Sequence, residues 1–399
     1  MTPRDETSFP THIGRYLVEA RVGGGGMAAV YRGRPPPDLA DALPPVVAIK
    51  TLHPEFAADP EFRAMFEEEA EISGQMQHPN VVELYDFGQT ADNRMFLVME
   101  WVDGVDLGIV LRSFRERKLR MNPPIACAIL EWALRGLHAA HSRFDRDGNE
   151  LVVVHRDVSP ANVLLSSAGD VKIADFGLAR PLHRVRRTQP GIVKGKFAYL
   201  APEQTLDRNV DPRTDVFAAG IVLWEALASR HLFRRSTDLK TVLAIRDGKL
   251  RDILRYAPGL DGRVVEALRR ALRHDPAERF QSALDFADAL AAYLDDQKLG
   301  DRRKLVASVV REVRGALAAR TPRPSRASRL SLPRVPGPTE TKATGRPSTV
   351  DAPARVGRAS RTSRADAAST TEPLPLVRVR TKRPSATRVS IHAAPRARD

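Results

Sequence analysis

The chain has 399 residues, and 28% of them are charged. It carries a formal net charge of +14 and contains one cysteine. The single thiol, Cys127, excludes an internal disulfide bond, and its apolar surroundings IACAILEWAL favour a buried structural role. The first residues, MTPRDETSFP, are too polar for a signal peptide, and the longest apolar run, at about 218–228, is too short for a membrane span. We therefore expect a cytoplasmic protein without a membrane span.

The positive charge is concentrated toward the C-terminal end of the chain. Residues 301–399 contain 23 Lys and Arg against 7 Asp and Glu, which leaves a slightly negative charge on residues 1–300. The excess positive charge is therefore a property of residues 301–399 and gives no information about the partners of the first 300 residues.

The N-terminal third of the sequence is predicted to be rich in strands. Residues 16–110 contain short β-branched runs separated by turn signals, such as PVVAIKTL and RMFLVMEWV. One helix is predicted at about 60–77, where apolar residues recur every three or four positions. The proline-rich insert at 34–45 is predicted to be a surface loop, and residues 1–13 an N-terminal extension.

The pattern turns mainly helical from 122 onward, and the whole predicts an α+β fold. We expect a small β-rich lobe at about 14–102 and a larger α-helical lobe at about 103–296. Residues 297–319 are predicted to hold one accessory helix, with an amphipathic pattern over 302–319.

Several motifs at the ends of predicted strands suggest chemistry. The glycine run at 22–33 lets the backbone approach a phosphate closely, although such runs are more often plain turns. Lys50 ends the apolar strand VAIK and needs an anionic partner if it is buried, for which Glu69 on the next helix is the candidate. The alternatives are a solvated lysine and a solvated acidic helix face. Asp175 of DFG is a candidate Mg²⁺ ligand or an ordinary turn residue.

A polar loop lies between two apolar runs in VVVHRDVSPANVLL, residues 152–165. Loops anchored at both ends are a usual place for chemistry. Taken in order, the glycine run, VAIK, HRD with an asparagine five residues after its aspartate, DFG and APE (201–203) form the signature set of protein kinases. Over about residues 14–295 the chain resembles the eukaryotic-like (Hanks-type) serine/threonine protein kinases of bacteria.

This resemblance implies transfer of the γ-phosphoryl group of ATP to serine and threonine hydroxyls of protein substrates, with autophosphorylation and with ATP and Mg²⁺ as cofactors. It implies that Asp157 accepts the hydrogen bond of the substrate hydroxyl and acts as the base. Lys50 would hold the α- and β-phosphates and pair with Glu69, and Asn162 and Asp175 would bind the metal. The nucleotide site that it implies is a glycine loop, an apolar slot for adenine and the link between the lobes: Gly23, Gly25, Gly26, Val30, Ala48, Lys50, Leu164, Met99, Glu100 and Val102.

The resemblance also implies supporting roles outside the nucleotide site. Glu203 should form an ion pair with Arg279, and Asp215 should brace the backbone of the catalytic loop. Thr188 is the only serine or threonine between DFG and APE, and its phosphate could pair with Arg156 and order the loop. The alternative is an enzyme that is constitutively active or activated by a partner.

Two positions depart from the family pattern. Ser159 replaces the lysine of HRDxKPxN, and Lys196 replaces the threonine of GTxxYxAPE. We hypothesise that the two residues have exchanged roles, so that Lys196 is catalytic and supplies the charge beside the γ-phosphate. The alternative is that Lys196 lies in solvent and the chain is slow, or is a pseudokinase scaffold that binds nucleotide with little transfer. Ala28, at the third glycine, should only stiffen its loop.

The last segment, 320–399, is rich in Arg, Pro and Ser, has few large apolar residues and is predicted to be a disordered tail. Basic residues stand close to hydroxyls there, as in RPSRASRLS at 323–331. Three interpretations remain open: an autophosphorylation substrate, a segment that binds a polyanion or a regulatory partner, and, favoured by composition, a solvated appendage. No aromatic residue occurs in 321–399, which removes base stacking and argues against nucleic-acid binding.

Overall fold

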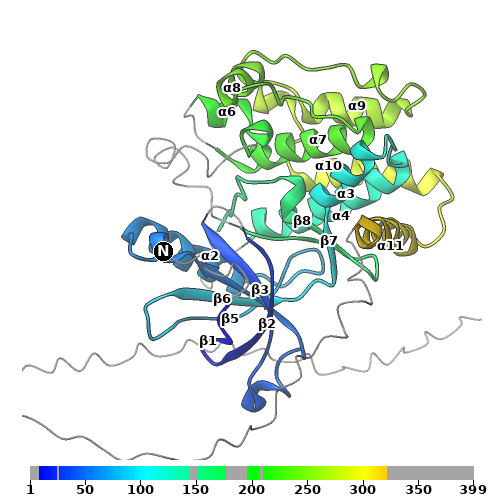
Figure 1. Ribbon diagram of the computed structural model, residues 1–399. Helices are drawn as coiled ribbons and strands as arrows, with labels where there is room; N and C mark the ends of the chain where they lie inside the picture. The colour runs from blue at the N-terminus through cyan, green and yellow to red at the C-terminus, as the bar shows by residue number, and fades with distance from the viewer. Residues whose placement is uncertain (1–8, 25–26, 144–150, 177–195, 207–209, 321–399) are drawn as a thin grey trace, which may run out of the picture. The chain divides into compact units, whose positions relative to one another are not determined.

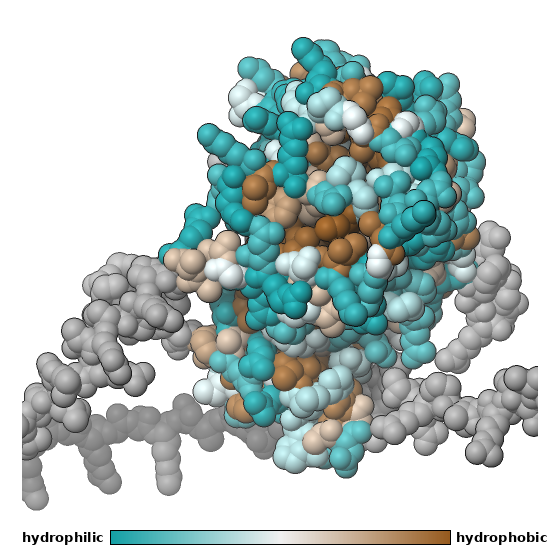
Figure 2. Space-filling model, turned by 90° about the vertical axis from the view of Figure 1, so that its right-hand side faces the viewer, coloured by the Kyte–Doolittle hydropathy of each residue, from teal (hydrophilic) through white to brown (hydrophobic). Residues whose placement is uncertain are grey.

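The computed structural model describes residues 9–24, 27–143, 151–176, 196–206 and 210–320, with Lys196 described by its backbone alone. Within these residues a sheet-rich N-terminal lobe is followed by a helical C-terminal lobe, which confirms the predicted α+β fold (Figure 1). On the face shown in Figure 2, hydrophilic side chains surround smaller hydrophobic patches, as is usual for a surface in water. None of the helices in the described ranges is both long enough and apolar enough to cross a bilayer.

The N-terminal lobe is built on a six-stranded antiparallel sheet with the order β1-β2-β3-β4-β6-β5. Its strands are β1 (His12–Ile13), β2 (Tyr16–Gly24), β3 (Ala28–Arg34), β4 (Val47–Leu52), β5 (Leu84–Gln89) and β6 (Met95–Glu100). β4 is central, and all six of its residues are buried, four of them apolar and the other two Lys50 and Thr51. The proline-rich insert holds only the short 3-10 helix η1 (Pro37–Leu39).

Helix α2 (Pro60–Gly74) crosses one side of this sheet, preceded by the single turn α1 (Pro54–Ala57). Asp59 caps α2 by accepting a hydrogen bond from the backbone N–H of Glu61, and Pro60 occupies the first turn, where a missing N–H costs nothing. The helix ends at Gly74, three residues before the predicted end, because glycine disfavours helix and Pro79 restricts the backbone ahead of it.

The C-terminal lobe combines a small sheet of β7 (Gly104–Asp106), β8 (Val163–Ser166) and β9 (Val171–Ile173) with a helical core. The helices are α3 (Leu107–Glu116), α4 (Pro123–His141), α6 (Pro202–Thr205), α7 (Pro212–Ala228), α8 (Asp238–Arg246), α9 (Gly262–Ala271), α10 (Ala283–Asp296) and α11 (Arg302–Arg320). The 3-10 turns are η2 (Pro160–Asn162), η3 (Lys196–Tyr199), η4 (Ile253–Arg255) and η5 (Pro276–Glu278).

Helix α7 is the centre of this lobe, because every residue from Thr214 to Ala228 is buried. A helix that is apolar on all sides needs neighbours all round, and α4, α9 and α10 pack against it. Cys127 on α4 lies in the same core, as predicted, and burial together with the charge of Asp261 raises the pKa of its thiol to about 12.

The predicted ion pair between Glu203 and Arg279 is present in the interior. The guanidinium donates from Nη1 and Nη2 to the two carboxylate oxygens, each at 2.8 Å, and Arg279 is only 1% exposed. Burial alone would raise the pKa of Glu203, but the hydrogen bonds and charge of Arg279 offset it, and the pKa lies below its usual value. The pair joins α6 to the turn before α10.

Arg279→Met should therefore destabilise the fold by about 3–5 kcal/mol, because it leaves the Glu203 carboxylate buried without its counterion. Denaturant unfolding of the purified chain measures this loss. Lys249→Met, which breaks the exposed pair with Asp247, is the matched control and should cost far less, because solvent screens this pair. Equal, small losses for both variants would contradict the importance of the buried pair.

Candidate functional site

A buried lysine joins the two lobes at the centre of the candidate site. Lys50 on β4 is 3% exposed, and its Nζ lies 2.7 Å from Glu69 Oε1 on α2 and 2.8 Å from Asp175 Oδ1, just after β9. Glu69 is 1% exposed because it lies on the face of α2 that packs on the sheet, between the buried residues Phe66 and Ala70. The structure thus brings together three predicted residues that are up to 125 positions apart.

The charge of Lys50 is stabilised by this arrangement. Burial by itself lowers the pKa of a lysine, but the charges of Asp175 and Glu69 more than offset it, and the pKa of Lys50 lies above its usual value. The ammonium is therefore retained in the interior and can present a fixed positive charge to an anion in the site.

The loop around HRD is anchored from beneath by Asp215, as predicted. Asp215 Oδ2 accepts hydrogen bonds from the backbone N–H of His155 at 2.7 Å, and Oδ1 accepts one from Arg156 at 2.8 Å. Asp215 is fully buried, and His141 Nε2 lies 2.8 Å from its Oδ2. Arg156 has a positive φ of 65°, and so does Asp175, a left-handed backbone that non-glycine residues adopt at a cost.

Asp157 and Asn162 lie together in this loop. Asn162 Nδ2 donates to the backbone carbonyl of Asp157 at 2.8 Å and approaches its Oδ2 at 3.3 Å. The Asn162 carbonyl accepts from the N–H of Ala174 at 2.9 Å, which ties the loop to the segment carrying Asp175. With Nδ2 engaged, Asn162 Oδ1 and the carboxylate of Asp175 offer oxygen donors of the kind that Mg²⁺ prefers.

A divalent cation would need further ligands beyond these two residues. No group of three or more His, Cys, Asp or Glu side chains with metal-ligand geometry occurs among the described residues. Mg²⁺ is typically held by one or two protein oxygens together with substrate phosphates and water, so the donor set fits a metal that arrives with a nucleotide.

The residues predicted to line an adenine slot come from both lobes. Val30 pairs in register with Lys50, and Ala48 with Met99, which places them on adjacent strands of the sheet. Leu164 contributes from β8 below. The backbone N–H of Glu100 already donates to Glu83 O at 2.8 Å, so only its carbonyl can serve as the predicted contact to the base.

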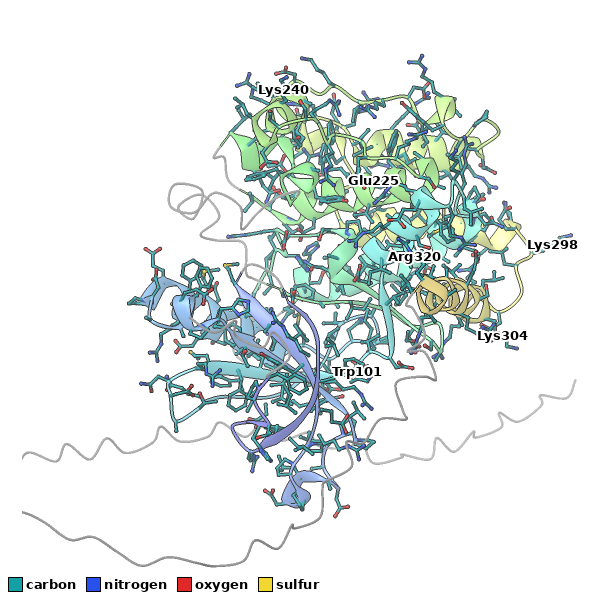
Figure 3. All side chains as sticks on the ribbon, viewed as in Figure 1. Trp101, Glu225, Lys240, Lys298, Lys304 and Arg320 are labelled. Atoms are coloured by element: carbon teal, nitrogen blue, oxygen red, sulfur yellow. The ribbon has the colours of Figure 1, made fainter. Side chains whose placement is uncertain are left out.

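The link between the lobes follows directly after β6. Trp101 marks its place in Figure 3, and Val102 comes next along the chain. Glu100 at its start pairs with Lys172 of β9 at 2.8 Å, a contact that sequence reasoning missed because no local pattern distinguishes Lys172. Gln204 was also missed: its Nε2 donates to the backbone carbonyl of Arg156 at 3.1 Å, and its only signal was a position next to APE.

Ser159 lies within the catalytic loop and is 3% exposed. Its Oγ has no hydrogen-bond partner within the described ranges. Lys196 begins η3, but its side chain is not among the described parts of the structure. The predicted residues Gly25, Gly26 and Thr188 also lie outside the described residues. Gly23 is described, near the end of β2, and an added Cβ there would meet open space.

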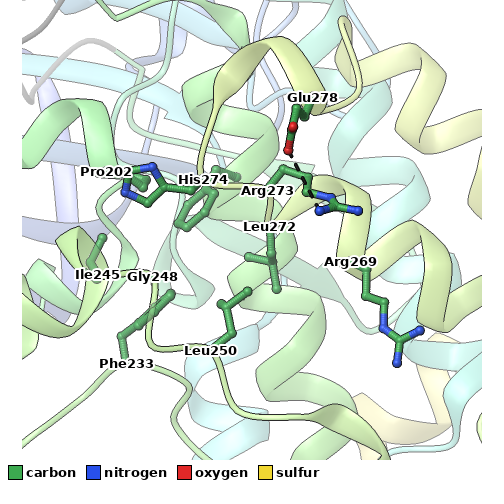
Figure 4. A pocket seen from close by; sticks show the side chains of 11 residues that line it. Pro202, Phe233, Ile245, Gly248, Leu250, Arg269, Leu272, Arg273, His274 and Glu278 are labelled. Atoms are coloured by element: carbon green, nitrogen blue, oxygen red, sulfur yellow. Dashed lines mark ion pairs between the residues drawn. The ribbon is translucent and has the colours of Figure 1, made fainter.

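A pocket lies away from these residues, in the C-terminal lobe (Figure 4). It has a volume of about 340 Å³ and lies among α6, α7, α8 and α9. Its floor is apolar, with Phe217, Phe233 and Leu272, and Arg273 and Glu278 lie at its edge as a loose ion pair of 3.9 Å. None of the predicted site residues lines it.

Comparisons with known proteins agree with this geometry. Residues 16–291 match the protein kinase domain family. The tyrosine-protein kinase MasK of Myxococcus xanthus is 35% identical over 289 residues, covering 72% of this chain and 44% of MasK. The serine/threonine-protein kinases PknL and PknA of Mycobacterium tuberculosis are 35% and 33% identical, covering 72% and 71% of this chain and 68% and 62% of their own lengths.

The fold also matches solved structures. The Mycobacterium tuberculosis PknI kinase domain superposes with a TM-score of 0.54 at 29% identity, covering 71% of this chain and 99% of that domain. The chain thus spans less than half of MasK and nearly the whole of the isolated PknI domain.

Asp215→Asn should loosen the catalytic loop without changing its size. One carboxylate oxygen is replaced by an amide NH2 group, which cannot accept from a backbone N–H, so a buried donor of His155 or Arg156 is left unsatisfied. We expect a loss of about 1–3 kcal/mol in the free energy of unfolding, together with faster amide exchange at residues 155–157. Unchanged exchange at those amides would show that Asp215 does not hold the loop.

Proposed function

Because the chain belongs to the protein kinase family, we propose that it transfers the γ-phosphoryl group of ATP to serine and threonine hydroxyls of proteins. The observation that carries the proposal is the buried junction of Lys50 with Glu69 and Asp175. Phosphoryl transfer depends mainly on positioning and on charge stabilisation, and this junction fixes a cation against the site where phosphates would lie.

The remaining residues are assigned the roles that the resemblance to the family implies. Lys50 would hold the α- and β-phosphates, and Asp175 and Asn162 would hold the Mg²⁺, which neutralises phosphate charge during transfer. Asp157, fixed by Asn162, would accept the hydrogen bond of the substrate hydroxyl and take its proton.

The adenine would lie in the slot between the lobes. Val30 and Ala48 would cover it from the sheet and Leu164 from β8, because a flat apolar-faced base favours a dry slot. The carbonyl of Glu100 and the backbone of Val102 would recognise its polar edge, with Met99 behind them.

We further propose that Lys196 supplies the charge that Ser159 lacks. A serine hydroxyl carries no charge, and the Ser159 Oγ is buried without a hydrogen-bond partner in the described part of the chain. A cation at this position stabilises charge on the transferred group in the family pattern, and Lys196 stands where that pattern has the threonine that contacts this cation.

Two further roles are proposed on the sequence. Thr188 is the candidate phosphorylation site in the segment between DFG and APE, and residues 320–399 are the candidate contact for a regulatory partner. The cytoplasmic location remains a prediction. A pseudokinase scaffold is the second candidate function, and Ser159 is the observation that favours it.

Phosphate transfer by the full-length chain tests the proposed function. The wild type incubated with Mg-ATP should acquire phosphate on serine and threonine, including Thr188, as mapped by mass spectrometry. Asp157→Asn should lower the rate by about 10²–10⁴, because the positioned base is lost.

Two outcomes would contradict this account. A wild type that binds ATP but transfers no phosphate, also with added protein substrates, would support the scaffold. Phosphate found only on tyrosine would show that the acceptor is tyrosine, as the name of MasK states for that protein, and not serine or threonine.

The exchange of roles is tested with Lys196→Ala, which should lower the rate of transfer by about 10²–10³. Lys194→Ala, two residues away in the same KGK sequence, is the matched control and should stay within about twofold of the wild type. The double variant S159K/K196T, which restores the usual family pattern, should recover much of the lost rate. A Lys196→Ala rate within a factor of two of the wild type would refute the exchange.

A further inference from the structure

Helix α11 lies beyond residue 291, where the match to the kinase family ends, yet it is seated firmly on the C-terminal lobe. Val306, Val309, Val310 and Val313 are all buried, and they belong to the same apolar cluster as the core of α3, α4 and α10. Their spacing of three and four residues places them on one face of the helix. In Figure 1, α11 lies beside α4 and below α10, and Lys304 and Arg320 mark its first turn and its end in Figure 3.

The turn between β8 and β9 is shaped to receive the start of α11. Gly169 has a φ of +93°, and an added Cβ there would lie 1.9 Å from the backbone carbonyl oxygen of Arg303. The next residue, Asp170, forms an ion pair with the side chain of Arg303. This turn therefore fits against the backbone of α11 as well as its side chains.

A buried carboxylate on α4 also depends on α11. Glu131 is 4% exposed, with one oxygen 2.7 Å from Arg135 Nε. The other oxygen faces Arg302 Nη1 of α11 at 3.5 Å. A buried carboxylate is destabilising without a compensating positive charge. Arg302 supplies part of that charge only while α11 packs against α4, which favours the packed position of the helix.

The second half of α11 reaches the link between the lobes through Arg314. Arg314 Nη1 lies 3.0 Å from Asp103 Oδ1 and 2.7 Å from Ser167 Oγ. Asp103 directly follows Val102, and its backbone carbonyl accepts from the N–H of Ser167 at 2.7 Å. Ser167 follows β8, the strand that carries Leu164.

Arg314 therefore bridges the two segments that would enclose the adenine. We propose that α11 is a brace of the nucleotide slot and that Arg314 is a positioning residue, which holds Asp103 of the link against the β8–β9 turn. A slot held in its bound geometry loses less freedom when a nucleotide enters, and so binds it more tightly. The inference rests on the proposed function, because it assigns Arg314 a role in the binding of ATP.

The test compares single substitutions in the full-length chain. Arg314→Ala should raise the dissociation constant of ADP in Mg²⁺, measured by calorimetry, and the KM for ATP by about two- to fivefold, as expected for an exposed ion pair. The kcat at saturating ATP should change less than about twofold, because the reacting groups are untouched. Arg314→Lys should recover part of the affinity.

Arg311→Ala is the matched control on the same helix, since Arg311 forms no ion pair with any described residue. It should leave the ADP affinity unchanged. A second pair releases the whole helix: Val310→Asp, which puts a charge on the buried face, should weaken ADP binding more than Arg314→Ala does, whereas Ser308→Asp on the exposed face should not. Inorganic tripolyphosphate, which lacks the base, should compete equally well against every variant that remains folded.

The outcomes separate this inference from the proposed function. A wild type that binds no adenine nucleotide would overturn both. A wild type that binds ADP and an Arg314→Ala variant of equal affinity and KM would overturn the brace alone. Equal weakening of ADP and tripolyphosphate would also overturn it, because a brace of the adenine slot should not act on the phosphate subsite.

Discussion

The contact on which the rest of the site depends is the buried ammonium of Lys50 between the carboxylates of Glu69 and Asp175. Lys50 and Glu69 would each be costly in the interior without a partner, and the partly exposed Asp175 adds a second carboxylate to the ammonium. One carboxylate comes from a helix of the N-terminal lobe and the other from the segment after β9. The pair of contacts therefore fixes the register of α2 on the sheet and ties the two lobes across the place where phosphates would bind.

The same principle, a charge held by a partner from a distant segment, recurs through the C-terminal lobe. Asp215 takes up two backbone N–H groups of the catalytic loop, and Arg279 neutralises Glu203. Ser159 in the catalytic loop differs, because its buried hydroxyl lacks a hydrogen-bond partner among the residues that the structure describes. It lies where the family pattern has a lysine.

Much of the fold could be predicted from the sequence, since strands and helices follow from local apolar periodicity, and the order of the motifs indicated the site. Glu69 shows the limit of the pattern: Glu67, Glu68 and Glu71 are equally acidic neighbours, and only packing on the sheet buries Glu69. The sequence predicts the helix over 302–319 but not the surface on which it packs. Arg314 and Asp103 are 211 residues apart, and local patterns carry no information about such distant contacts. Several arginines of the positively charged stretch 301–399 form ion pairs with acidic residues of the C-terminal lobe, which composition alone does not indicate.

The central claim is that one site, built around Lys50, holds the nucleotide and its metal. A crystal structure of the chain with Mg²⁺ and a non-hydrolysable ATP analogue tests it most directly. We expect the metal about 2.1 Å from oxygens of Asp175 and Asn162, the typical Mg²⁺–oxygen distance, with Lys50 Nζ on the phosphates and the base beside Val102. A nucleotide bound elsewhere, or a metal that touches neither Asp175 nor Asn162, would contradict the account.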